Sequence, residues 1–223
     1  MNELELKKLW QTTNDKLDES IVINKKNTED ITRVKVQSIL GSMKPIKIFT
    51  LLLGILWVGI GVIALSSIYL NSFSETNKFF LFSAAIQVSL TAMALFIYLY
   101  QLITIYQVDI TDPIIRTQEK LSSLKISTLW VTRILFLQLP VWTTFWWNET
   151  MLTDWDILQW VVPLLFTISF TVVAIWLFFN IKYENRNKKW FQLIFSRKEW
   201  TPLMKSMELL EQLEGFKGQN VST

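Results

Sequence analysis

The sequence predicts an all-α integral membrane protein with four transmembrane helices, both termini in the cytoplasm and an amphipathic helix in each tail. Three observations predict this fold: four long apolar runs, polar tails on either side of them, and an uneven distribution of cations. A hydrocarbon core of about 30 Å requires about 20 predominantly apolar residues in helical form. All four runs meet this length, and they cover approximately residues 46–70, 79–107, 126–147 and 157–181.

The cations predict the orientation of these spans. The N-terminal tail and the C-terminal tail each carry eight lysines and arginines, and the middle loop carries Arg116, Lys120 and Lys125. The loop at 71–78 has only Lys78, and the loop at 148–156 has no cation. Loops rich in lysine and arginine stay in the cytoplasm. We therefore expect both termini and the middle loop inside, and the two cation-poor loops outside.

Each tail contains an apolar stripe at helical spacing. Residues 2–17 predict a short amphipathic helix, and a second helix is expected from about residue 27 to residue 43. The four-span domain at 46–181 follows, and then an interfacial segment and a last helix at 182–223. Because short helices are marginal in water, we expect the two stripes to pack together or to bind a partner. The stripe residues are Leu6, Leu9, Trp10 and Leu17 in the first tail, and Leu203, Met207, Leu210 and Leu213 in the last.

The second span carries a polar stripe. Its members are spaced by three or four residues, so they share one face of a helix. In lipid such a face must turn toward other helices or toward water. Two interpretations stay open: hydrogen bonds between helices, or a hydrated path for a solute. The stripe comprises Ser83, Gln87, Thr91, Tyr98 and Gln101, and Gln138 in the third span is a further polar candidate.

We interpret Arg133, in the third span, as the only cation within an apolar run. It lies about seven residues, or roughly 10 Å, from the start of the run at its inner end. An arginine at such depth needs a partner or a route for its head group to the interface. Asp109 and Asp112 in the middle loop are the predicted ion-pair partners. Pro140 is expected to kink the same span, and the helix that starts after Pro113 is expected to run into the span without a break.

The composition excludes several function classes. The chain has no cysteine and no histidine, which rules out disulfides, thiolate chemistry and histidine ligation of metals. No glycine-rich phosphate loop or hydrolase motif occurs. We therefore expect no enzymatic activity, no cofactor and no metal. The basic tails suit anionic lipid, so no nucleic-acid partner is expected.

Three segments resemble a group of small four-span bacterial inner-membrane proteins. They are Glu5 to Gln11, Lys16 to Glu19, and the connection from Asp112 to Leu124. The resemblance implies a bacterial inner (plasma) membrane protein. That group has no assigned activity or functional residues, so no site is carried over.

These observations lead to one functional hypothesis and two alternatives. The hypothesis is a regulatory or scaffolding membrane protein whose tail helices bind a partner, such as a transcription factor held in the manner of an anti-sigma factor. One alternative is a transporter or channel component that uses the polar face of span two and Arg133. The other is a structural subunit of a larger membrane complex. A homo-oligomer fits each of the three.

Overall fold

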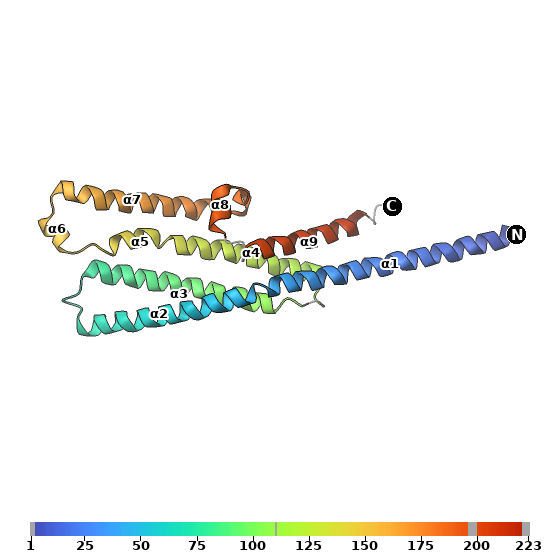
Figure 1. Ribbon diagram of the computed structural model, residues 1–223, viewed down its shortest axis with the longest axis horizontal. Helices are drawn as coiled ribbons and strands as arrows, with labels where there is room; N and C mark the ends of the chain where they lie inside the picture. Colours follow the sequence, from blue (N-terminus) through green and yellow to red (C-terminus); the bar gives the residue numbers. More distant parts are fainter. Residues whose placement is uncertain (1–2, 110, 196–199, 220–223) are drawn as a thin grey trace.

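The computed structural model describes residues 3–109, 111–195 and 200–219, and this part of the chain is helical without strands. The tail helix α1 leads into two helical hairpins, and short helices follow the last apolar segment (Figure 1). The helices are α1 (Glu3–Gly41), α2 (Lys44–Asn71), α3 (Lys78–Tyr106), α4 (Ile114–Phe136), α5 (Leu139–Thr144), α6 (Thr150–Asp154), α7 (Ile157–Asn180), the 3₁₀ helix η1 (Tyr183–Asn185), α8 (Lys189–Ile194) and α9 (Trp200–Gln219).

Four helical segments of the described chain are long and apolar enough to cross a membrane. They lie within Glu5–Asn71, Lys78–Tyr106, Ile115–Thr144 and Ile157–Asn180. This confirms the four apolar helices expected from the sequence.

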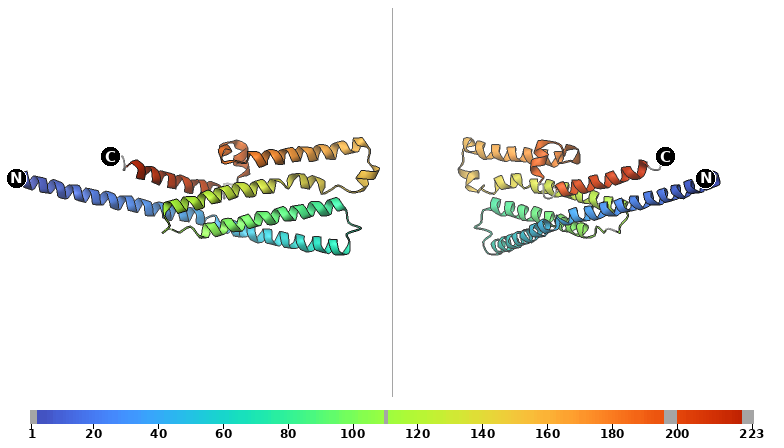
Figure 2. Two further views of the ribbon diagram at one scale, coloured as in Figure 1. Left: turned by 180° about the vertical axis from the view of Figure 1, so that it is seen from behind. Right: turned by 45° about the vertical axis from the view of Figure 1, so that its right-hand side comes forward.

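Both termini lie at one end of the bundle, which we call the tail end, and the α2–α3 turn and α6 lie at the opposite, hairpin end (Figures 1 and 2).

Glycines set the close approach of α2 and α3. A Cβ atom at Gly54 would lie 2.3 Å from Leu95 Cδ2, and one at Gly61 would lie 2.7 Å from Val88 Cγ2. Neither distance leaves room for a methyl group. Small residues at such crossings let apolar helices pack at short range in lipid, so Gly54 and Gly61 have a packing role between α2 and α3.

The third apolar segment is broken where the sequence predicts a kink. Helix α4 ends at Phe136 and α5 begins at Leu139, with Pro140 in its first turn. Proline has no backbone N–H to donate and is tolerated in the first turn of a helix. Helix α4 begins at Ile114 and is continuous as far as this break, as expected.

The tail-end core is formed where four helices meet. It consists of buried residues from α1 and the junction that follows it, from the end of α3 and the loop after it, from α4 and from α9: Val36, Leu40, Met43, Ile105, Val108, Leu121, Leu124, Leu203 and Leu210. The N-terminal tail is one continuous helix here, so the prediction of two separate helices was wrong. The apolar stripe residues from Leu6 to Leu17 and the buried Val36 and Leu40 belong to the same helix, and the segment between them is helical as well.

Candidate functional site

The polar stripe predicted on the second span lies on the face of α3 that packs into the bundle. Ser83, Gln87 and Gln101 are buried, and Thr91 and Tyr98 are half-buried. Two of these side chains bind the kinked third segment. Ser83 Oγ and Thr144 Oγ1 share a hydrogen bond of 3.0 Å, and Gln138 Nε2 donates to Thr91 Oγ1 over 3.0 Å. Of the two interpretations left open, these bonds favour a role in holding helices together.

Lys47 binds the tail-end part of the same stripe. Its side chain is only 1% exposed, and its Nζ donates to Gln101 Oε1 over 2.7 Å. The ammonium also lies 4.5 Å from the centre of the Tyr98 ring. Cations over an aromatic face are attracted by the ring quadrupole. This cluster therefore connects the start of α2 to α3 through a buried charge.

Lys47 is a site residue that sequence reasoning missed. It lies at the second position of the run 46–70, so the interpretation of Arg133 as the only cation within an apolar run was wrong. A signal was present in the spacing. Val36, Leu40 and Met43 are followed by Lys47 at intervals of four, three and four residues, which places it on the buried face of a continuing helix.

Arg133 is not paired with Asp109 or Asp112, so the predicted ion pair was wrong. Its Nε and Nη2 both donate to the backbone carbonyl of Ile181, over 2.9 and 2.5 Å. Ile181 is fully buried and is the C-cap residue of α7. The prediction measured depth from the start of the apolar run, but α4 begins at Ile114, which sets Arg133 about 28 Å along the helix from the loop. Arg133 therefore provides hydrogen-bond donors for a backbone carbonyl at the end of α7.

The two aspartates are held locally in the middle loop. Asp112 Oδ2 accepts a hydrogen bond of 2.5 Å from Lys120 Nζ, and Arg116 lies 3.6 Å from its other oxygen. The hydrogen bond from Lys120 lowers the pKa of Asp112 below its usual range. Asp109 Oδ1 accepts from the backbone N–H of Thr111 over 3.1 Å. These contacts fix the turn between α3 and α4.

The C-terminal stripe is buried as predicted, but its partners differ from the prediction. Leu203, Leu210 and Leu213 are buried and Met207 is half-buried. Leu203, Met207 and Leu210 pack in the tail-end core with the second half of α1. The N-terminal stripe does not join them: Leu6, Leu9, Trp10 and Leu17 are 51%, 61%, 73% and 56% exposed. A tail layer forms, therefore, without the residues predicted to supply its N-terminal half.

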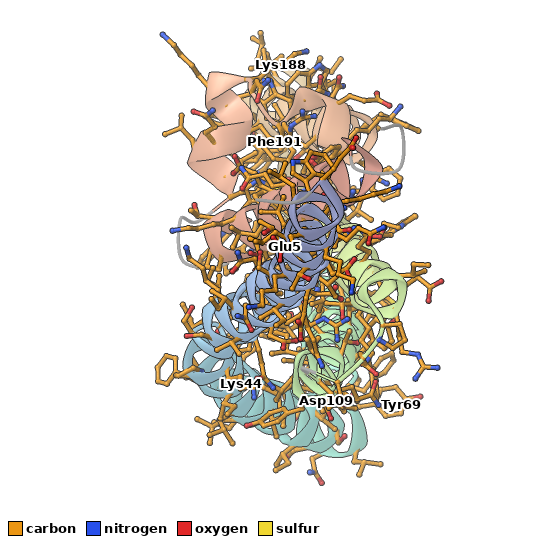
Figure 3. The ribbon with its side chains drawn as sticks, turned by 90° about the vertical axis from the view of Figure 1, so that its right-hand side faces the viewer. Glu5, Lys44, Tyr69, Asp109, Lys188 and Phe191 are labelled. Atoms are coloured by element: carbon orange, nitrogen blue, oxygen red, sulfur yellow. The ribbon has the colours of Figure 1, made fainter. Side chains whose placement is uncertain are left out.

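The N-terminal stripe lies outside the tail-end core because α1 is longer than α9. Helix α1 has 39 residues and α9 has 20, and α1 projects well past α9 at the tail end (Figures 1 and 2). Viewed along the long axis, Glu5 on this projecting part lies between the α8 side, marked by Lys188 and Phe191, and the α2–α3 side, marked by Lys44 and Asp109 (Figure 3). The exposed stripe and the neighbouring Thr13 and Asn14 line a shallow groove on this part.

Comparisons of the chain with protein-family models, curated proteins and solved structures gave no match. The candidate site is therefore defined by geometry alone and has two parts. The first is the polar stripe of α3 described above, which we call the polar seam from here on. The second is the exposed apolar stripe on the projecting half of α1.

Proposed function

We propose that this is a non-enzymatic regulatory or scaffolding protein of the bacterial inner membrane, with both termini in the cytoplasm. The observation that carries the proposal is the exposed stripe of Leu6, Leu9, Trp10 and Leu17 on a helix that extends beyond the bundle. A large apolar stripe with a tryptophan at its centre is costly in water and suits a partner surface. An apolar stripe at helical spacing is also what a partner groove recognises.

The partner that we propose is a helical cytoplasmic protein, such as a transcription factor kept at the membrane in the manner of an anti-sigma factor. The four apolar helices would anchor the chain, and the tail-end core would fix the base of α1. Transport has less support, because the polar seam is occupied by bonds between Ser83 and Thr144, Thr91 and Gln138, and Lys47 and Gln101.

The test is recovery of a partner from membranes solubilised in mild detergent. A glutamate within the stripe, Leu17→Glu, should remove a partner that co-purifies with the wild-type chain. Gln11→Glu adds the same charge at another exposed position of α1 and should leave the partner bound. Equal recovery with both variants would reject the stripe as the binding surface, and recovery of a membrane complex that both variants retain would favour the structural-subunit alternative.

A further inference from the structure

A pocket of about 290 Å³ lies between α2, α3 and α5 in the hairpin-end half of the bundle. Four aromatic side chains line it: Trp57, Phe80, Trp142 and Phe145. Phe80 and Phe145 pack edge to face with ring centres 4.6 Å apart. The α2 side of the pocket includes two small residues, Gly61 and Ala64, among larger apolar side chains. The size is near the lower limit of small-molecule sites.

One polar side chain also lines this pocket. Gln87 is 9% exposed, and its Nε2 finds no hydrogen-bond acceptor among the described residues. The neighbouring members of the seam differ, since Ser83 is bonded to Thr144 and Thr91 to Gln138. Between Gln138 and Thr144, at helical spacing from both, comes Val141, whose side chain has no acceptor to offer. Among the described residues, two amide side chains of the seam therefore have an Nε2 without an acceptor, those of Gln87 and Gln101. Of these two, Gln87 lies in the pocket wall.

The depth of Gln87 restricts what can fill this position. Nine residues of helix separate it from Lys78, so it lies about 14 Å below the hairpin end of α3. The ester groups of phospholipids lie at the edge of a hydrocarbon core about 30 Å thick. An unpaired donor at this depth is costly in lipid. Its acceptor must come from a molecule that dissolves in the core.

We propose that this pocket binds a planar lipid-soluble ring compound with a ring carbonyl, the chemical class to which membrane quinones belong. The carbonyl oxygen accepts a hydrogen bond from Gln87 Nε2, and the ring packs against the aromatic side chains. This site is independent of the stripe on α1, so it does not depend on the proposed partner.

The test compares two probes that differ in the carbonyl groups: 2-methyl-1,4-naphthoquinone and 2-methylnaphthalene. Binding to the purified full-length protein in detergent is measured by equilibrium dialysis, with protein-free micelles subtracted. The wild-type chain should bind about one quinone, roughly tenfold more tightly than the hydrocarbon, which is the upper end of the range for one hydrogen bond. Gln87→Leu should abolish this preference, and Ser89→Ala, at an exposed position of α3, should preserve it.

Two further measurements make the test decisive. Because Gln87 is buried without a partner for Nε2, Gln87→Leu should raise the thermal midpoint of the ligand-free protein while it weakens quinone binding; a residue with only a packing role would not separate these effects. Ala64→Phe should fill the pocket and weaken both probes. Two outcomes would overturn the proposal. One is that the probes partition into micelles without saturation of a site on the protein. The other is that both probes bind equally and that Gln87→Leu does not change their binding, as expected for a groove that holds acyl chains.

Discussion

At the scale of single residues, polar groups in this bundle are accommodated by neutral partners. Lys47 binds an amide oxygen and an aromatic face, and Arg133 binds a backbone carbonyl. An amide or a carbonyl satisfies the donors of a cation without adding a second charge that must also be removed from water. The sequence shows where the cations are, but the partners come from segments 54 and 48 residues away, and no local pattern identifies them.

Removal of Lys47 should expose its role. Lys47→Met keeps a long apolar side chain but leaves Gln101 Oε1 without its donor, so we expect a loss of about 1–3 kcal/mol in the free energy of unfolding in detergent. The double variant Lys47→Met/Gln101→Leu should recover most of this loss, because both polar partners are then gone. Lys35→Met, at an exposed position of α1, serves as the control. A fully additive double variant would mean that the two side chains do not depend on each other.

Asp112 should make the stability of the loop dependent on pH. Lys120 lowers the pKa of this carboxyl in the folded protein, so its contribution is complete above the ordinary aspartate range and is lost as the pH falls through the lowered pKa. Thermal midpoints measured from about pH 6 down to about pH 2 should fall less steeply for Asp112→Asn than for the wild-type chain. The same slope in both would exclude this carboxyl as a source of acid sensitivity, and Asp15→Asn on α1 is the matched control.

At the scale of elements, α1 combines two environments in one helix. Its second half packs in the tail-end core through Val36 and Leu40, and its first half has the exposed stripe. Periodicity identified the stripes of α1 and α9, but it could not show that residues 18–27 continue the helix. Stripes alone also could not reveal that the buried partner of α9 is the second half of α1, because relative length decides which segments lie side by side.

This division predicts two rates of backbone hydrogen exchange within α1. Amides of residues 29–41 should be protected by packing, and amides of residues 5–25 should exchange much faster, since a helix without tertiary contacts is marginal in water. Exchange measured by mass spectrometry on peptic fragments of the protein in detergent would show the difference. Uniform slow exchange over the whole helix would mean that the first half is already covered, for example by a second copy of the chain.

At the scale of the whole molecule, most of the architecture follows from the sequence. The four apolar segments, the kink at Pro140, the polar stripe on one face of α3 and the apolar face of α9 were all predicted, because apolar length, proline and helical spacing act locally. The seam's partners, the contact of Arg133 and the pocket at Gln87 depend on how helices distant in sequence face one another. How these distant helices face one another cannot be predicted from the sequence alone.

The orientation in the membrane is a prediction for the complete chain. Reporter fusions after Thr76 and Thr153, in the cation-poor connections at the hairpin end, should be active outside the cytoplasm. Fusions at both termini should report a cytoplasmic location. The structure places the two termini at the same end, so a result with the termini on opposite sides would contradict both the four-span arrangement and the distribution of cations.

The near-continuous course of α1 and α2 has a mechanical consequence. The two helices run almost in line, with only Ser42 and Met43 between them (Figure 1). Residues 29–41 of α1 belong to the packed part of the helix, so the projecting arm is formed by residues 3–28. When a change in bilayer thickness alters the tilt of the spanning helix by about 5°, the tip of an arm about 39 Å long moves by about 3 Å, provided that the arm stays helical. Membrane thickness would then be converted into displacement of Leu6, Leu9 and Trp10 without any domain outside the cell.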